Sequence, residues 1–419
     1  MGAVAEDRVD VVVIGAGLAG LRCAGVIAAA GRDVQVWEQH DDVGGRVRTD
    51  AIDGFLCDRG FQVLNPAYPE LQRAVDLTAL DLRPFAAGVA VRRQAGSAVL
   101  VHPLREPRGV PKMLASGAVR PADVVAIARW ALPALRPGAL TSHPGSDSTL
   151  KAALDKSGVR GEVRRVIDRF LAGVLLDDTG SASNAFSLLL ARMFVLGVPA
   201  LPAAGMQALP QLMARPLSGR IHLNQKVTRI ERAGTGWQVW GGAGSVRADD
   251  VVVATDPLTA ASLTDSPTPA TRGVVTDWWA ADEAPTTRPM LWIDARRDAA
   301  GPVLNTAVIS AAAPSYAPEG QHLIAASALL GADGAPAPEA ATRRHAADIL
   351  GVDARPWRLL TRSTIRHALP VQSVPLRVRR PVDVGDGLWW CGDHRDTASI
   401  QGALVSGRRT AEKILAGRS

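Results

Sequence analysis

The chain contains 419 residues, of which 47% are hydrophobic and 21% are charged. This length exceeds one ordinary compact core and predicts two domains or one large composite fold, while the composition excludes global disorder. The net charge is +6, but no basic run has the pattern of a nucleic-acid-binding stripe. Three cysteines without a C-x-x-C pair argue against a disulfide scaffold and a zinc site. We therefore expect no metal, no nucleic-acid partner and a reducing, cytoplasmic location.

The N-terminal segment has the pattern of a nucleotide-binding strand, turn and helix. Residues 9–14 form a β-branched apolar run, which is typical of a buried parallel strand. The motif Gly15-Ala16-Gly17-Leu18-Ala19-Gly20 follows, and residues 18–30 predict an apolar helix. A second predicted strand, residues 34–37, is followed by Glu38, which stands 18 residues after Gly20.

Each residue type in this unit suits a dinucleotide. Gly15 permits a tight turn, Gly17 lets the backbone approach a pyrophosphate, and Gly20 lets the helix pack closely on the sheet. The helix N-terminus offers free N–H groups to the phosphates, and Glu38 can accept both hydroxyls of a ribose. A glycine-rich packing turn alone does not explain an acid at the end of an apolar strand. The segment therefore predicts dinucleotide binding.

A second glycine motif, Gly44-Gly45-Arg46, begins six residues after Glu38 and is followed by Thr49. A single nicotinamide-binding half has no need of it. At this point the sequence resembles the flavoprotein group that contains flavin amine oxidases, phytoene desaturases and protoporphyrinogen oxidases. The resemblance implies that these three residues lie along the FAD pyrophosphate and the flavin edge. It also implies that the segment Gly60-Phe61-Gln62 runs beside the isoalloxazine ring.

The C-terminal segment supports the same resemblance independently. A predicted strand at residues 387–391 precedes Gly392-Asp393, and Ser399-Ile400-Gln401 precedes a predicted helix. The resemblance implies that Asp393 holds a ribityl hydroxyl and that the backbone of Ile400 and Gln401 lies near the flavin pyrimidine. A helix dipole aimed there stabilises negative charge on reduced flavin.

The middle of the chain adds a weaker element. Residues 220–231 predict a strand that contains Val227, and the run at residues 251–255 predicts a second strand on the nucleotide side. In the flavoprotein group that this chain resembles, the backbone of the first strand contacts the adenine edge. The resemblance implies this role for Val227. These strands are ordinary in isolation, and only their order among the other motifs makes them specific.

The combined motifs predict an α/β fold with a Rossmann-type FAD-binding domain and a discontinuous α+β substrate domain, as in the amine oxidase and phytoene desaturase group. We expect the FAD domain to comprise residues 1–75, 201–260 and 366–419, and the substrate domain residues 76–200 and 261–365. Residues 121–137 predict a helix between prolines that is too short to span a bilayer. It can pack in a core, line a channel or rest on a membrane surface.

The predicted site binds FAD non-covalently through residues from both ends and the middle of the chain. These residues are Gly15, Gly17, Leu18, Ala19, Gly20, Glu38, Gln39, Gly44, Gly45, Arg46, Gly60, Phe61, Gln62, Val227, Gly392, Asp393, Ser399, Ile400 and Gln401.

Departures from the amine oxidases bear on the substrate. Amine oxidases of the resembling group place a lysine near flavin N5, but this chain has no lysine between Lys226 and Lys413. Ser399 stands where a tyrosine that flanks the amine is common. These departures favour the desaturase side of the group. His367 is a candidate general base, although a lone histidine is more often a structural hydrogen-bonding residue, and the same applies to His394 next to Asp393.

The leading hypothesis is an FAD-dependent oxidoreductase that oxidises or desaturates a small, rather apolar substrate by hydride transfer to flavin N5. Oxygen or another acceptor then takes the electrons. The alternatives are a flavin-dependent isomerase or cyclase without net redox change, an amine oxidase, and a non-catalytic binding protein such as the Rab escort proteins that resemble this fold. We expect a small-molecule substrate and no integral membrane segment, and peripheral membrane contact stays open. Substrate identity and oligomeric state do not follow from the sequence.

Overall fold

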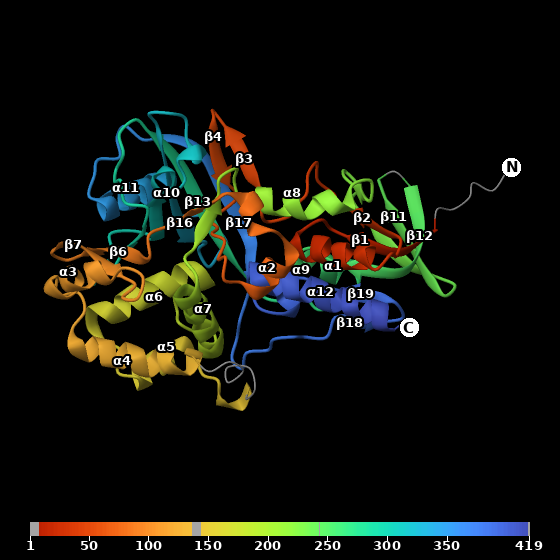
Figure 1. Cartoon of the computed structure of the whole chain (residues 1–419), viewed down its shortest axis with the longest axis horizontal. Helices are drawn as coiled ribbons and strands as arrows, with labels where there is room; N and C mark the ends of the chain where they lie inside the picture. Colours follow the sequence, from red (N-terminus) through yellow and green to blue (C-terminus); the bar gives the residue numbers. More distant parts are fainter. Residues whose placement is uncertain (1–7, 136–143, 243, 418–419) are drawn as a thin grey trace.

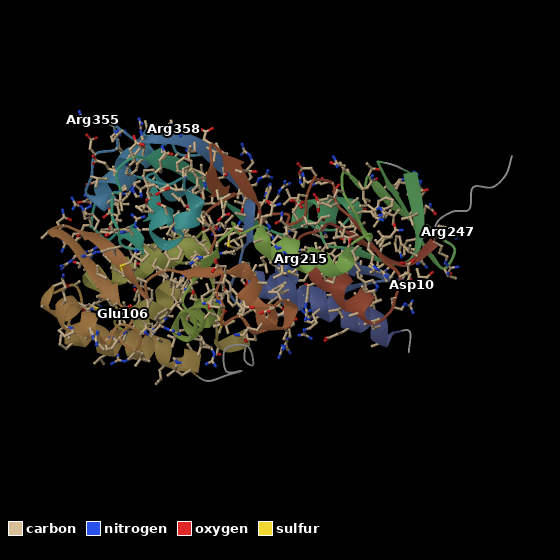
Figure 2. The ribbon with its side chains drawn as sticks, turned by 45° about the horizontal axis from the view of Figure 1, so that its top comes forward. Asp10, Glu106, Arg215, Arg247, Arg355 and Arg358 are labelled. Carbon is tan, nitrogen blue, oxygen red and sulfur yellow. The ribbon has the colours of Figure 1, made fainter. Side chains whose placement is uncertain are left out.

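The computed structural model describes residues 8–135, 144–242 and 244–417, which form two lobes built around separate sheets (Figure 1). The lobe on the right of the view contains the N-terminal strand–turn–helix unit and the C-terminal helix. The lobe on the left contains the second sheet and most of the remaining helices. Charged side chains occur in both lobes, and Arg355 and Arg247 lie at opposite ends of the molecule in Figure 2.

The first sheet is the predicted nucleotide-type unit. Its parallel strands lie in the order β9, β2, β1, β12, β19. Their bounds are β1 Arg8–Ile14, β2 Val34–Trp37, β9 Ile221–His222, β12 Gly244–Val253 and β19 Leu388–Trp390. β10 (Arg229–Ala233) and β11 (Gly236–Gly241) continue from β12 as an antiparallel meander, and β18 (Asp383–Gly385) pairs with β19. Val11, Val12 and Val13 of β1 are fully buried, as a strand covered on both faces requires.

Two helices cover one face of this sheet, α1 (Leu18–Ala29) and α12 (Ile400–Ala416). They pack closely because an added Cβ on Gly407 would lie only 2.2 Å from the carbonyl oxygen of Ala19. The short helices α2 (Pro69–Ala74) and α8 (Ala208–Ala214) contact the same pair. On the opposite face, α9 (Pro257–Leu263) packs its Ala260 into a cluster with Val12 and Ile14.

In the described part of the chain, the second sheet has seven strands in the order β17, β13, β16, β15, β14, β6, β7. Their bounds are β6 Gly88–Arg93, β7 Gly96–Val101, β13 Thr271–Ala281, β14 Leu291–Asp294, β15 Val303–Val308, β16 His322–Leu329 and β17 Arg358–Pro370. α11 (Glu339–Leu350) packs on one face and α6 (Gly161–Leu175) on the other. β17 runs as one strand across residue 366, the predicted boundary between the substrate domain and the FAD domain.

A helical layer lies beside α6. It contains α3 (Val110–Ala115), α4 (Pro121–Ala131), α5 (Leu150–Lys156) and α7 (Asn184–Leu196). The predicted helix over 121–137 is present as α4 and a 3-10 turn at Leu132–Leu135, while its last two positions lie outside the described residues. α4 buries Trp130 and exposes Val124 and Val125. Among the described residues, no helix is both long and apolar enough to cross a membrane.

The remaining elements are short connections between the two lobes and within each. They are β3 Thr49–Ile52, β4 Phe55–Asp58, β5 Leu82–Pro84, β8 Ala200–Pro202, α10 Ile309–Ala312 and the 3-10 turns Leu77–Leu80, Pro107–Gly109, Pro144–Ser146, Arg215–Leu217, Pro314–Tyr316 and Asp393–Arg395.

The predicted α/β class is confirmed, and one strand prediction is wrong. Val227 lies in the connection between β9 and β10, not in a strand. The reason is that this connection hydrogen-bonds to the chain after β2. The N–H of Gln225 donates to the carbonyl of Glu38 at 2.7 Å, and the N–H of Asn224 donates to that of His40 at 2.9 Å.

Candidate cofactor and substrate site

The turn between β1 and α1 places its three glycines in different surroundings. An added Cβ on Gly15, whose φ is +103°, would lie 3.1 Å from the carbonyl oxygen of Ala254. One on Gly20 would lie 2.0 Å from the carbonyl oxygen of Gly15, whereas one on Gly17 would meet no atom within 4 Å. Gly15 and Gly20 thus hold the turn against the sheet, and the open side of Gly17 leaves room for a pyrophosphate. The first turn of α1, which contains Leu18 and Ala19, has no acidic residue and no side-chain cap, so its N–H groups suit an anion.

The second glycine motif lies directly against this turn. The N–H of Gly44 donates to the carbonyl of Ala16 at 2.9 Å, and Gly44 forms a parallel bridge with Gly17. An added Cβ on Gly45, with φ of +60°, would lie 3.4 Å from the Cα of Gly17. Both motifs therefore form one main-chain cradle.

Glu38 is buried where β2 ends, with 4% of its surface exposed. Its Oε2 accepts the N–H of Ala16 at 2.7 Å, and its Oε1 accepts the N–H of His40 at 3.0 Å. A carboxylate has about four lone-pair positions, so one remains on each oxygen for a ribose diol. Because it accepts the N–H of Ala16, Glu38 also holds the glycine turn in place, a role that the sequence did not indicate. The neighbouring Gln39 is exposed, and its amide contacts the ring of His40 at 3.1 Å.

Val227 fits an adenine contact despite the absence of a strand. Its side chain is buried in the cluster that contains Trp37 and Val239. Among the described residues, its main-chain N–H and C=O take no hydrogen-bond partner. A buried peptide unit normally finds a partner, so these groups suit the edge of a purine.

Arg46 joins the two lobes. Its Nη2 lies 2.7 Å from Oδ1 of Asp393, and its Nη1 donates to the carbonyl of Ala368 on β17 at 2.6 Å. Asp393, in the turn after Gly392, is 4% exposed, and within the described chain Arg46 is its only side-chain partner. The structure thus brings together two residues from opposite ends of the chain that the sequence assigned to one cofactor. Oδ2 of Asp393 keeps its acceptor positions for a ribityl hydroxyl.

The segment from Gly60 to Gln62 runs beside β17 and Arg46. Gly60 has φ of +85°, and an added Cβ there would lie 3.0 Å from the Ile365 side chain. Gln62 donates its amide to the carbonyl of Arg46 at 2.7 Å, and the N–H of Phe61 donates to Oγ1 of Thr276 at 3.3 Å. This segment therefore fixes the main chain of Arg46.

The N-terminus of α12 is capped by Ser399, whose Oγ accepts the N–H of Gly402 at 3.0 Å. Ile400 is partly buried in the core. The side chain of Gln401 reaches α2, because its Oε1 accepts the N–H of Glu70 at 3.0 Å. The contact of the Gln401 main chain with a flavin stays a prediction.

Two histidines lie close to this cradle. His367 is half-buried on β17, next to Ala368, and its Nδ1 lies 2.7 Å from Oγ1 of Thr271. That contact fixes the ring and leaves Nε2 without a partner among the described residues. His394 is 2% exposed and packs edge-on against Trp390, and neither of its ring nitrogens has a hydrogen-bond partner there. Burial lowers the pKa of His394 to about 4, against the opposing effect of the Asp393 carboxylate, so this ring is neutral near pH 7.

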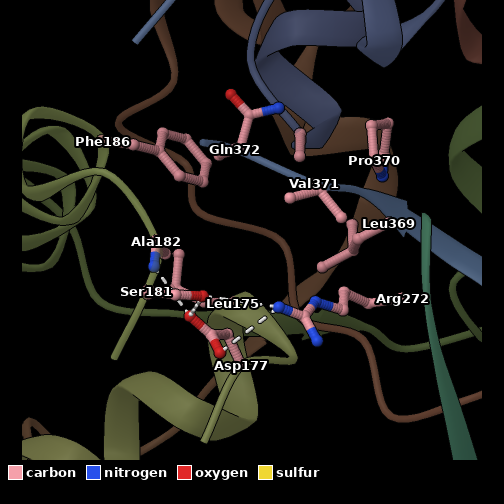
Figure 3. A pocket seen from close by; sticks show the side chains of 11 residues that line it. Leu175, Asp177, Ser181, Ala182, Phe186, Arg272, Leu369, Pro370, Val371 and Gln372 are labelled. Carbon is pink, nitrogen blue, oxygen red and sulfur yellow. Dashed lines mark hydrogen bonds and ion pairs between the residues drawn. The ribbon is translucent and has the colours of Figure 1, made fainter. Parts of the chain in front are cut away.

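A small cavity lies at the end of β17, beyond Ala368 (Figure 3). The lining residues come from the end of α6, the connection between α6 and α7, α7, β13, the end of β17 with the two residues after it, and the segment before α12. They are Leu175, Asp177, Ser181, Ala182, Phe186, Arg272, Leu369, Pro370, Val371, Gln372 and Ala398. Sequence reasoning missed this cavity. The spacing of Asp177, Thr179 and Ser181 is typical of a loop capped by its own side chains, but nothing in the sequence pairs it with Arg272. No described group of three or more His, Cys, Asp or Glu side chains is placed to hold a metal.

Comparison with known proteins tests the resemblance. A protein-family model described as flavin-containing amine oxidoreductase matches residues 18–415. Putrescine oxidase of Kocuria rosea is 30% identical over 283 residues, which cover 59% of this chain. The chain spans 57% of the length of that relative.

Solved structures share the fold at low identity. A putrescine oxidase bound to putrescine is similar over 98% of this chain and 99% of its own, with a TM-score of 0.69 and 21% identity. An oxidoreductase from Methanosarcina mazei covers 96% of this chain and 100% of its own, with a TM-score of 0.75 and 18% identity. These likenesses confirm the predicted α/β fold.

The resemblance that the glycine motifs and the Gly392-Asp393 turn indicated is thus confirmed, and the family that matches is one of flavin-containing oxidoreductases. The family match extends almost from one end of the chain to the other. The chain therefore belongs to the family of flavin-containing amine oxidoreductases.

Proposed function

We propose that this protein binds FAD non-covalently and oxidises or desaturates a small, rather apolar substrate beside the flavin. One observation carries the proposal: residues from distant parts of the chain form an unbroken series of contacts. The series runs from Glu38 through Ala16 and Gly44 to Arg46, and then to Asp393 and β17. An extended dinucleotide fits along such a series, with the flavin next to the cavity at the end of β17.

Each part of the series suits a different portion of FAD. Glu38 accepts the ribose hydroxyls, the open side of Gly17 and the α1 N-terminus receive the pyrophosphate, and Asp393 accepts a ribityl hydroxyl. The N-terminus of α12 directs its dipole at the pyrimidine and stabilises negative charge there. When bound, the flavin supplies a two-electron acceptor for hydride. Oxygen or another acceptor completes the cycle.

The apolar character of the substrate rests on one part of the cavity lining, which Leu175, Phe186, Leu369 and Val371 form. The rest of the lining is polar, from Asp177, Ser181, Arg272 and Gln372. Amine oxidation is the second candidate, because putrescine oxidase is among the relatives of the chain. Isomerisation without net redox change is the third. A cytoplasmic location stays a prediction.

The first test is cofactor retention. The purified protein should be yellow, and Glu38→Ala should weaken FAD binding about 10- to 100-fold, because two charge-assisted contacts and the anchor of the glycine turn are lost. The exposed Glu231→Ala is the matched control and should bind FAD like the wild type. An unchanged FAD dissociation constant in Glu38→Ala, or a colourless protein that takes up no added flavin, would refute the proposal.

We further propose His367 as the proton acceptor of the oxidised substrate, because Thr271 fixes its ring and Nε2 is available. His367→Ala should retain FAD and lower the rate of anaerobic flavin reduction by at least about 100-fold. A reduction rate equal to that of the wild type would show that His367 serves only as a hydrogen-bonding residue of β17.

A further inference from the structure

The exposed large apolar side chains of this protein gather in one part of the described chain. There are ten of them, and eight come from residues 104–196, which make up less than a quarter of the sequence. The other two, Leu359 and Val384, lie on β17 and β18. Apolar side chains exposed singly are ordinary, but a concentration of them marks a surface that docks onto another body.

The outer face of α4 and of the 3-10 turn that follows it is apolar. Val125, Leu132 and Leu135 are 58%, 57% and 59% exposed. Val125 and Leu132 are seven residues apart, so they lie two turns apart on the same side of the helical path. The opposite side packs on the protein and buries Trp130. A surface helix normally has its polar residues on the outer side, and α4 lacks them.

The same face has almost no hydrogen-bonding groups. Between residues 121 and 135, Arg129 is the only exposed polar side chain. Asp123, the one acid of this segment, is buried and lies 3.0 Å from Arg120. A protein partner would normally form about one hydrogen bond for each 100–200 Å² of interface. The acyl region of a bilayer forms none, so the face suits lipid better than protein.

The apolar surface continues from the turn after α4 onto the end of α7. Arg192 of α7 donates to the carbonyl of Ala134 at 3.0 Å. One turn later, Leu196 is half exposed, and its carbonyl accepts the guanidinium of Arg105 at 2.7 Å. This contact brings the neighbouring Leu104, which is 82% exposed, to the same end of α7. The exposed apolar side chains therefore form one surface.

A groove of about 440 Å³ opens beside this end of α7. Most of its lining is apolar, and it shares Leu196 and Arg105 with the surface just described. An acyl chain is itself long and apolar, so the groove extends the area that lipid can cover. The other residues that line it include Pro66, Leu82, Pro84 and Val198.

The charges around this surface are mainly positive. Arg108, Lys112 and Arg129 are exposed, and no ion pair joins any of them to another described residue. Glu106 is the only exposed acid between residues 102 and 135. A second copy of the chain docked here by two-fold symmetry would bring like charges together, which is unfavourable. Anionic headgroups have the opposite charge and attract such residues.

We propose that the surface formed by α4, the turn after it, the end of α7 and the adjoining groove binds a bilayer that contains anionic phospholipid. α4 then lies parallel to the membrane plane, with Val125 and Leu132 among the acyl chains. The stem of Arg129 lies along the apolar region and its guanidinium reaches the headgroups. Binding of this kind is peripheral and reversible, and it does not depend on the proposed function.

The test is cosedimentation of the full-length, FAD-loaded protein with vesicles. Vesicles of phosphatidylcholine mixed with phosphatidylglycerol are compared with vesicles of phosphatidylcholine alone. We expect binding to the mixed vesicles that is at least about 10-fold tighter than binding to the neutral ones, because three unpaired cations contribute. Absence of binding to the mixed vesicles, or equal binding to both kinds, would overturn the proposal.

Apolar variants locate the contact. The double variant Val125→Ser with Leu132→Ser should bind the mixed vesicles at least about 10-fold more weakly, because two aliphatic side chains no longer enter the acyl region. The matched control is Leu359→Ser with Val384→Ser, which removes the two exposed apolar side chains outside this surface and should bind like the wild type. Wild-type affinity in the Val125 and Leu132 variant would overturn the proposal.

Charge variants give a second measurement if the serine variant does not fold. Lys112→Gln with Arg129→Gln should weaken binding to the mixed vesicles about 10-fold. Arg355→Gln is the control, because Arg355 is 90% exposed at its side chain and lies in the loop between α11 and β17. Equal affinity of the Lys112 and Arg129 variant and of the wild type would contradict the proposal.

The oligomeric state tests the rival occupant, a second copy of the chain. Gel filtration of the wild type and of the Val125 and Leu132 variant should give the same monomeric size. A wild-type dimer that this variant converts to a monomer, together with no binding to vesicles, would show that the surface docks on itself and would overturn the proposal.

Discussion

The nucleotide lobe and the cavity differ in the chemical groups from which they are built. Around Gly17 and Gly44 the available groups are main-chain N–H and C=O groups, and their positions follow from turns and helix starts. At the cavity the groups are side chains such as Arg272 and Gln372, which converge from separate elements. A main-chain site needs glycine at fixed spacings and therefore leaves a mark in the sequence. A side-chain site depends on tertiary packing and leaves none.

The sharpest test of this difference lies in α1, where two glycines have opposite surroundings. Gly20→Ala should destabilise the protein by about 3 kcal/mol and abolish FAD binding, because its Cβ would lie 2.0 Å from the Gly15 carbonyl oxygen. Gly25→Ala, with no atom within 4 Å, should stabilise α1 by about 0.5–1 kcal/mol. Urea unfolding and flavin absorbance measure both. Equal behaviour of the two variants would refute the idea that main-chain packing defines this lobe.

Within the nucleotide lobe, the buried Glu70 side chain joins α1 and α12 through ion pairs. It is fully buried and lies 2.7 Å from Arg22 of α1, 2.9 Å from Arg408 of α12 and 3.5 Å from Arg73. Glu70→Ala should lower the free energy of unfolding by about 2–3 kcal/mol. Breaking a fully buried ion pair costs more, but here the three arginines are partly exposed to solvent.

The control for Glu70 is Glu412→Ala, which removes an exposed partner of Arg408 and should cost about 0.5 kcal/mol or less in urea unfolding. A Glu70→Ala cost as small as that of Glu412→Ala would mean that α1 and α12 are joined by backbone packing alone.

Asp58 lies between the lobes and should make stability depend on pH. It accepts hydrogen bonds from Thr49, Met206 and Tyr316. Burial raises its pKa to about 6 against these hydrogen bonds, which lower it. The folded state therefore holds this proton more tightly than the unfolded chain, whose Asp pKa is about 3.9. The raised pKa of Asp58 therefore adds about 2–3 kcal/mol to the free energy of unfolding below pH 4. This contribution is lost as the pH rises through about 6.

Asp58→Asn should remove this loss. The difference in unfolding free energy between wild type and variant, measured by urea at pH 4 and at pH 7, isolates Asp58 from other titrating groups. If the difference in unfolding free energy stays constant with pH, the pKa of the Asp58 carboxyl is not raised in the folded protein.

The smallest effect is expected on the outer face of α4. Val125 is 58% exposed, so Val125→Ser should change the unfolding free energy by less than about 0.5 kcal/mol. Urea unfolding of the full chain tests it. A loss above 1 kcal/mol would indicate that another part of the chain or a second copy covers this face.

Much of the nucleotide lobe could be predicted, and the reasons are local. The apolar runs of β1 and β2 and the helix after Gly17 follow from short patterns, and Glu38 was found by its distance from Gly20. Val227 was placed in the wrong element because its segment hydrogen-bonds to the chain after β2, a contact that no local pattern reports. The side chain of Gln401 bonds to Glu70, which the sequence could not show.

The cavity could not be predicted for a different reason. Asp177 and Arg272 are far apart in the chain, and an aspartate near an arginine is common in any protein. What distinguishes the pair is its hydrogen bonding. The carboxylate of Asp177 accepts four hydrogen bonds from its own loop, whereas Arg272 donates one long hydrogen bond to Ser181. That property depends on Ser181 and Ala182 as placed by the tertiary fold.

The Arg46 contacts described above have a thermodynamic consequence. One guanidinium touches both Asp393, in the cofactor cradle, and Ala368, one residue before the cavity wall. Any rearrangement of that guanidinium during flavin uptake is transmitted to the strand that carries Leu369. Because such coupling is reciprocal, the factor by which bound flavin changes the affinity for substrate equals the factor by which bound substrate changes the affinity for flavin.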